Sequence, residues 1–331
     1  MNRLIVYTWS DASDPNYFLQ TLESNVNTAV IILGPEESWI KVPPYHKDIT
    51  DFWNKIDSIL VNNNNTLDIL IGTNDYKSKL ISSKVNVHCW PTGWLSSSYQ
   101  RFHEYNTQFV QELVDIKYPF VSMINVPRRH RCCLMDELSR LNLISMGSIS
   151  WNMLVSEIYG YVYPWKFWEE TILHVDDFYN KNKKDQYTVP EAYKKSFIDL
   201  VSETSVDQIF LTEKTARPLF HKKPFIVQGA ANFHKYLTTL GFILYDEIID
   251  YSFDQEVDSE IRSRMIVQEI EKIAKNGNYN DLRKKIHEKI EFNYSKFCSI
   301  ALDKTLLPKI LLDNLVAGDR YTHRITEMYS V

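Results

Sequence analysis

Short apolar runs alternate with amphipathic, helix-type stretches along most of this 331-residue chain. A short, continuous apolar run is typical of a buried strand, and apolar residues spaced three or four apart are typical of a helix. Strands that alternate with helices predict parallel sheets with helices packed on their faces. We therefore predict an α/β fold built from doubly wound, Rossmann-like sheets.

Two sets of this alternation follow one another along the chain. In the first, helical stretches near residues 17–23, 49–61 and 101–113 accompany four strand candidates: RLIVYTW, TAVIILG, TLDILIG and VNVHCW. In the second, helices predicted at residues 130–141, 166–179, 213–221 and 232–240 accompany five more: PFVSMI, LISMGSI, FIDLVS, PFIVQG and FILYD. From about Asp258 the pattern is helical to the last residue.

A proline marks the predicted boundary between two lobes. Pro119 interrupts a helical stretch just before the next strand candidate, and a proline disfavours helix at the residue before it. We therefore predict a first lobe over residues 1–116 and a second lobe over residues 117–290. Residues 291–331 would form a helical C-terminal tail that packs back on the first lobe.

The composition is that of an ordinary soluble protein, with 44% hydrophobic and 24% charged residues. No apolar run reaches the roughly 18–20 residues of a membrane helix, and the start MNRLIVYTWSD has no signal-peptide pattern. Its four cysteines lack disulfide or zinc spacing, which favours a reducing compartment. We expect no membrane partner and a cytoplasmic location, in a bacterium or in a virus-infected host cell.

An acidic loop joins a strand candidate to a helix in FIDLVSETSVDQIFLTEKTARPLF. Glu203 closely follows the apolar run, and Thr212 is the predicted N-cap of the helix. Glu213 suits the first helical turn, but the cation of Lys214 opposes the macrodipole by about 0.3–1 kcal/mol unless an anion binds there. Because phosphate is a common anion at such a position, Lys214 is either a phosphate ligand or a solvated surface lysine.

A second strand-to-helix turn also carries cations. The strand candidate PFVSMI leads into a helix whose apolar face contains Leu134, Leu138 and Leu141. The turn between them carries four basic residues: Arg128, Arg129, His130 and Arg131. Such a turn is either a solvated basic corner or part of an anion site. One diphosphate bound at both turns would explain why each of them carries cations at the start of a helix.

These two segments resemble the donor-site motifs of the α1,3-fucosyltransferases. The family pattern F-E-N-S, Y-V-T-E-K and V-P-V-V-x-G corresponds here to SETS, FLTEK and PFIVQG. The family also has an arginine seven residues before a leucine, as Arg131 stands before Leu138. The similarity extends to bacteriophage and bacterial glycosyltransferases with a basic turn before the same E-K-T block, and it covers roughly residues 120–254.

The resemblance implies a two-lobed glycosyltransferase of the GT-B type, with the acceptor on the first lobe and a nucleoside diphosphate sugar, GDP- or UDP-linked, on the second. It implies a donor-binding set of six residues: Arg128, Arg131, Phe210, Thr212, Glu213 and Lys214. Two departures put base and sugar identity in question. Thr204 replaces the asparagine of F-E-N-S, and Phe210 replaces a tyrosine that contacts the nucleotide, so a GDP-fucose donor does not follow.

The expected reaction is sugar transfer to a hydroxyl group, with inversion implied by the resemblance. Arg131 and Lys214 would stabilise the negative charge that grows on the leaving diphosphate. Glu213 would bind the ribose hydroxyls, and Glu203 would orient the sugar or the arginine turn. Asp75 or, as an alternative, Asp11 would deprotonate the acceptor, although either can also be a turn-forming aspartate.

Other motifs are weaker. Glycine-rich phosphate loops are absent from the sequence, as are H-x-x-x-H and H-E-x-x-H, so no metal or redox cofactor is predicted. The pair Asp176-Asp177 could bind a metal but falls within a predicted helix. The segment from Trp90 to Trp94 could line an acceptor groove or belong to the core.

The acceptor is predicted to be a glycan or another small molecule. A bacteriophage enzyme that glycosylates hydroxymethylated DNA is an alternative, although the net charge of −5 opposes a broad nucleic-acid surface. A non-catalytic nucleotide-binding protein on the same scaffold is a second alternative.

Overall fold

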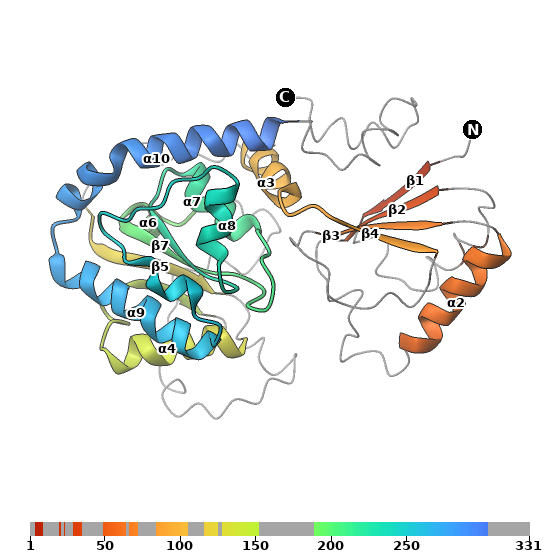
Figure 1. The fold of residues 1–331 in the computed structure, drawn as a ribbon. Helices are drawn as coiled ribbons and strands as arrows, with labels where there is room; N and C mark the ends of the chain where they lie inside the picture. The colour runs from red at the N-terminus through yellow and green to blue at the C-terminus, as the bar shows by residue number, and fades with distance from the viewer. Residues whose placement is uncertain are drawn as a thin grey trace. The chain divides into compact units, whose positions relative to one another are not determined.

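The structure is a computed structural model that describes residues 4–8, 20, 23, 29–34, 49–63, 66–71, 84–104, 116–124, 128–151 and 189–303. The chain divides into two compact units (Figure 1). The first comprises Met1–Ser96 with Leu302–Val331, and the second comprises Ser97–Ala301. None of the described helices is both long and apolar enough to cross a membrane.

The first unit contains a parallel sheet of four described strands in the order β1-β2-β3-β4. They are β1 (Leu4–Thr8), β2 (Ala29–Gly34), β3 (Leu67–Ile71) and β4 (Val85–Cys89). Each lies within one of the four strand candidates of the first set, and helix α2 (Ile49–Asn62) matches its prediction. These strands follow chain order, so the reversal of a doubly wound sheet does not occur among them.

The second unit contains a parallel sheet in the order β6-β5-β7-β8. Its strands are β5 (Tyr118–Ile124), β6 (Ser148–Trp151), β7 (Ser196–Ser202) and β8 (Phe225–Gln228). From β5 the chain forms β6 on one side, and then returns past β5 to form β7 and β8 on the other side. This reversal is the feature of a doubly wound sheet.

Helices cover both faces of the second sheet. The described helices from residue 93 onward are α3 (Gly93–Glu104), α4 (Arg129–Arg140), α6 (Glu191–Lys194), α7 (Glu213–Phe220), α8 (Phe233–Thr239), the 3-10 helix η4 (Tyr251–Gln255), α9 (Ser259–Asn276) and α10 (Tyr279–Leu302). Helices α4 and α9 pack together on one face, while α7, α8 and α10 lie on the other (Figure 1). Because both faces are covered, every residue of β7 is buried.

Two predicted strands differ from the structure. Residues 143–147 form a turn, so the strand candidate LISMGSI becomes β6 only from Ser148 onward. A Cβ atom on Gly147 would lie 2.2 Å from Cζ of Phe120, so this close approach requires glycine.

The candidate FILYD forms a loop. Strand β8 is the last strand of the sheet, and the loop finds its partner in a side chain of α10. Asn293 accepts the N–H of Ile243 at 2.8 Å and donates Nδ2 to the carbonyl of Ile243 at 2.8 Å. One amide side chain thus satisfies both backbone groups that a neighbouring strand would otherwise pair.

Two helix boundaries also differ from their predictions. Helix α3 begins at Gly93 rather than near residue 101, and the described part of it ends at Glu104. The helical pattern predicted from Asp258 is confirmed through Leu302 by α9 and α10. Helix α10 continues through residue 290, where the sequence predicted the start of a separate tail.

Candidate functional site

The predicted basic turn and the predicted acidic loop meet at the carboxyl edge of the second sheet. Strands β5 and β7 are neighbours there, and the chain leaves β5 into α4 on one face and β7 into α7 on the other. Such a switch point is where parallel α/β sheets bind ligands. The described part of the turn after β5 begins at Arg128.

Three side chains of this turn bind consecutive carbonyl groups at the end of β7. Arg128 donates Nη1 to the carbonyl of Thr204 at 2.7 Å, and His130 donates Nε2 to the carbonyl of Glu203 at 3.0 Å. Arg131 donates Nη2 to the carbonyls of Ser202 and Glu203, both at 3.2 Å. These bonds join the two turns across the switch point.

Burial sets the charge of this turn. Arg131 is 3% exposed, and burial together with the neighbouring Arg128 lowers the pKa of Arg131 to about 10, so it stays cationic at neutral pH. Burial and the cation of Arg131 lower the pKa of His130 to about 3. The imidazole is therefore neutral, and the turn carries its positive charge on arginines.

The carboxylate of Glu203 is fully buried and lies at the start of α7. It accepts hydrogen bonds from the N–H of Thr212 at 3.1 Å and from the hydroxyls of Thr212 and Thr215, each at 2.6 Å. A further N–H, that of Thr204, lies 3.3 Å from it. Glu203 thus serves as an internal anion at this helix N-terminus, while its carbonyl accepts from the arginine turn.

Thr212 is the N-cap of α7, as the sequence predicted: its hydroxyl oxygen accepts the N–H of Lys214 at 3.2 Å. Thr212 and Phe210 are both almost fully buried, at 2% and 3% exposed. Their side chains therefore pack inside the fold, where they support the loop.

Glu213 and Lys214 reach the surface of the site. The Nζ atom of Lys214 lies 2.6 Å from Oε1 of Glu213 and 3.5 Å from the hydroxyl oxygens of Thr204 and Thr212. Burial opposes the ionisation of Glu213, but the ammonium of Lys214 lowers the pKa of this carboxyl, so Glu213 is ionised at neutral pH. The cation of Lys214 near the helix start is therefore offset by Glu213 and by buried Glu203, and an incoming phosphate would compete with Glu213.

The start of α4 differs from that of α7. Its N-cap residue Arg128 makes no side-chain capping bond, and its first turn contains no acidic residue. Arg129, the first residue of α4, is largely exposed and forms an ion pair with Glu260 of α9. The N–H groups at this end of the helix can donate hydrogen bonds to an anion, and Arg128 lies beside them.

Two residues that sequence analysis missed hold the loops of this edge. Arg262 of α9 donates Nη2 to the carbonyl of Gly229 at 2.8 Å and Nη1 to the carbonyl of Glu256. Gln228, the last residue of β8, donates to the carbonyl of His130 and accepts from the hydroxyl of Ser202, both at 2.6 Å. A signal for Arg262 was present, because it shares the helical spacing of the buried residues Ile266, Ile270 and Ile273.

A histidine–aspartate pair nearby has a structural role. His234 binds Oδ1 of Asp254 through Nδ1 at 2.9 Å and accepts the N–H of Val227 through Nε2 at 3.1 Å. Asp254 also accepts the N–H groups of His234 and Lys235, both at 2.9 Å, at the start of α8. Because both ring nitrogens are engaged within the fold, this pair is not poised for proton transfer.

The predicted catalytic bases Asp75 and Asp11 lie outside the described residues, as does the pair Asp176-Asp177. Within the described part of the chain, no group of three or more histidine, cysteine or acidic side chains could hold a metal ion. Two hollows, of about 610 Å³ and 400 Å³, are lined by none of the six predicted donor-binding residues. The switch point is thus an edge of polar groups, distinct from both hollows.

No family model, curated protein or solved structure matches this chain. The resemblance to fucosyltransferases therefore rests on the motif residues themselves.

Proposed function

We propose that this protein is a two-lobed glycosyltransferase of the GT-B type that transfers a sugar from a nucleoside diphosphate sugar to a hydroxyl group of a glycan or another small molecule. The observation that carries the proposal is the meeting of the basic turn with the loop that leads to Lys214, at the β5–β7 switch point. They are far apart in sequence, yet Arg128, His130 and Arg131 bind the strand end that leads to Lys214. Each feature alone has a structural explanation, but their convergence suits a diphosphate.

In the proposed reaction, the bond between the anomeric carbon and the diphosphate oxygen breaks as the acceptor oxygen bonds to that carbon. Negative charge grows on the diphosphate, which leaves with the bonding electron pair. Arg128 and Lys214 would receive this charge directly, because both are only partly buried. Fixed cations need little reorganisation during the reaction, which is how electrostatic stabilisation accelerates it.

Arg131 and Glu203 would have roles different from those that the sequence predicted. The guanidinium of Arg131 is buried and bonded to backbone carbonyls, so it would add positive potential and hold the edge in place. The carboxylate of Glu203 would position α7, and with it Glu213 and Lys214, rather than contact the sugar. The acceptor proton would pass to Asp75 or, as the alternative, to Asp11.

Calorimetric titration with GDP, UDP and the corresponding sugar nucleotides tests the proposal. Lys214→Ala and Arg128→Ala should each weaken nucleotide binding by about 1.5–3 kcal/mol, the scale of hydrogen bonds to charged groups. Arg131→Ala removes a buried cation that is bonded to backbone carbonyls, so it should weaken binding less and also lower the melting temperature. Lys285→Ala, on an exposed position of α10, is the matched control. Unchanged affinity in folded Lys214 and Arg128 variants would rule out this diphosphate site.

A further inference from the structure

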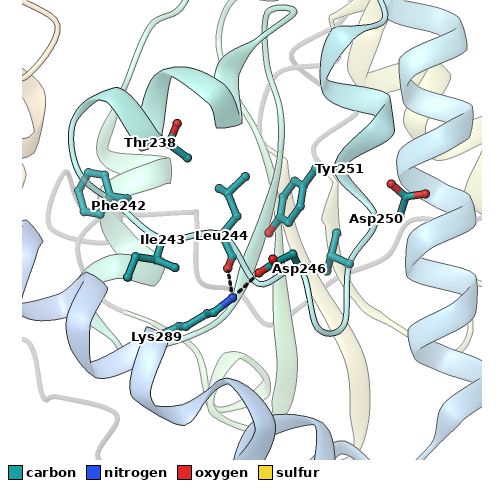
Figure 2. A pocket seen from close by; sticks show the side chains of 9 residues that line it. Thr238, Phe242, Ile243, Leu244, Asp246, Asp250, Tyr251 and Lys289 are labelled. Atoms are coloured by element: carbon teal, nitrogen blue, oxygen red, sulfur yellow. Dashed lines mark hydrogen bonds and ion pairs between the residues drawn. The ribbon is translucent and has the colours of Figure 1, made fainter.

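A hollow of about 610 Å³ lies in the second unit between α8, the loop over residues 241–250, and α10 (Figure 2). It shares no lining residue with the proposed donor site. The residues that line it are Thr238, Phe242, Ile243, Leu244, Asp246, Ile249, Asp250, Tyr251 and Lys289.

The walls of this hollow are held in place by side chains of the fold. Lys289 of α10 donates to the carbonyl of Leu244 at 2.9 Å and pairs with Asp246, as Figure 2 shows. It also lies 2.8 Å from Oε2 of Glu247. Asn293 holds both backbone groups of Ile243. A preformed concave surface loses little conformational entropy on binding, which favours its use as a binding site.

The hollow has an apolar interior and an acidic rim. Phe242 and Ile249 are buried beneath it, and Ile243 is 39% exposed at its edge. Asp246 and Asp250 line the rim, and Glu247 adjoins it. Asp246 and Glu247 pair with the ammonium of Lys289, whereas the carboxylate of Asp250 lies apart from it and accepts the N–H of Ser252. With three carboxylates and one ammonium, the rim has a net negative charge.

We propose that this hollow docks a segment of a partner protein that carries an arginine or lysine beside an aliphatic residue. The aliphatic side chain would cover Ile243 and the interior, and the cation would lie against Asp250. An acidic segment would be repelled by the net negative charge of the rim, and a purely apolar segment would add no cation beside Asp250. The proposal is independent of the proposed function, because the two sites have no residue in common.

Fluorescence anisotropy with a labelled hexapeptide of alternating arginine and leucine tests the docking. Asp250→Asn removes one rim charge but keeps an oxygen that can accept the N–H of Ser252, so the local fold is retained. It should weaken binding about threefold to fivefold, the scale of a partly exposed ion pair. Ile243→Ser should weaken binding about tenfold through lost apolar contact.

Three controls distinguish docking in the hollow from non-specific electrostatic or apolar attraction. Glu288→Gln removes the same charge from an exposed position on α10 outside the hollow and should leave the affinity unchanged. A hexapeptide of alternating glutamate and leucine and one of alternating arginine and serine should both bind at least fivefold more weakly. The proposal is wrong if Glu288→Gln weakens binding as much as Asp250→Asn, or if the arginine–leucine peptide fails to bind by about 1 mM. Dimerisation that Ile243→Ser abolishes would instead identify the hollow as a contact between copies of this chain.

Discussion

The two parallel sheets of this protein have four described strands each, but they are wound differently. In the first unit β1, β2, β3 and β4 lie side by side in chain order. In the second, β5 lies between β6 and β7, so the chain reverses its direction across the sheet. Right-handed crossovers then place the helices after β5 and β7 on opposite faces, and the loops that lead to them diverge.

The difference in strand order shows where polar groups can gather in such a fold. The loops that diverge at the reversal contain Glu203, the arginine turn and the start of α7, and they are joined by the bonds of Arg128, His130 and Arg131. Strands in chain order leave no such divergence between neighbours. The proposed donor site therefore belongs to the second sheet, and the first sheet would contribute a base that follows one of its strands.

The largest expected effect tests whether the first sheet takes part in the chemistry. Asp75→Asn should lower turnover about a hundredfold to ten-thousandfold, the range for loss of a general base, with donor affinity nearly unchanged. An amide has the size of a carboxylate but does not take the proton. Steady-state rates and calorimetric donor titration on the same samples measure the two effects separately.

Asp11→Asn is the matched control, because it makes the same change after the strand candidate RLIVYTW. If both variants keep full turnover, the base comes from elsewhere. The division of roles between the two sheets would then have to be abandoned.

The second effect concerns the internal anion of the second sheet. Glu203→Ala should lower the free energy of unfolding of the second unit by about 3–5 kcal/mol, because it leaves the hydroxyls of Thr212 and Thr215 and the N–H of Thr212 buried without this partner. Urea unfolding measures the total, and hydrogen exchange locates it in residues 203–216. Asp207→Ala, an exposed position in the same loop, should stay within about 0.5 kcal/mol.

The Glu203→Ala variant also tests whether the two sheets unfold independently. Hydrogen exchange of residues 29–71 should stay unchanged, because the hydrogen-bond partners of Glu203 all belong to the second unit. Equal loss of protection in both sheets would show that they unfold as one body.

The third effect is a dependence of stability on pH that arises in the second unit. His221 lies against the rings of Tyr193, Phe102 and Phe220, and neither of its ring nitrogens has a hydrogen-bond partner among the described residues. Burial, with Arg217 and Lys223 nearby, lowers the pKa of His221 to about 3. Between pH 6.5 and 3 the unfolded chain therefore binds the proton and the folded chain does not, so stability falls as the pH falls.

One such histidine changes the free energy of unfolding by about 1.4 kcal/mol per pH unit, or about 2 kcal/mol at pH 5. His221→Phe removes this proton and fits an aromatic environment, so its unfolding free energy should depend less steeply on pH by that amount. Urea unfolding from pH 7 to pH 4.5 measures the difference. Equal slopes in the two proteins would contradict the assigned pKa.

Much of the fold followed from the pattern of apolar residues, because buried strands such as β8 contain short apolar runs. The apolar run of β7 is interrupted only by Asp199, which pairs with Arg217. The strand order did not follow from this pattern, since a parallel strand has the same sequence pattern in either winding. The candidate FILYD failed because an apolar run can be buried by a single helix: Asn293 and α10 took the place of a neighbouring strand.

The candidate site was predictable to a similar extent. Thr212 was identified as an N-cap from local chemistry, and the two charged turns were identified as companions. The direction of the Glu203 side chain was not, because threonine hydroxyls nine and twelve residues away decide it. Sequence spacing alone does not specify which of two nearby carboxylates, Glu203 or Glu213, makes its hydrogen bonds inside the fold.

The smallest expected effect concerns metal ions at the second sheet. In the proposed reaction Arg128 and Lys214 receive the charge of the leaving diphosphate, a task that a divalent cation performs in other transferases. Turnover with an excess of EDTA should therefore stay within about twofold of the untreated enzyme, since removing a metal would leave these cations in place. A sample treated with the calcium complex of EDTA controls for ionic strength. If EDTA abolished turnover and magnesium or manganese restored it, the charge would be carried by a metal. Asp176-Asp177, in the part of the chain that the structure leaves undescribed, would then be the first pair to mutate.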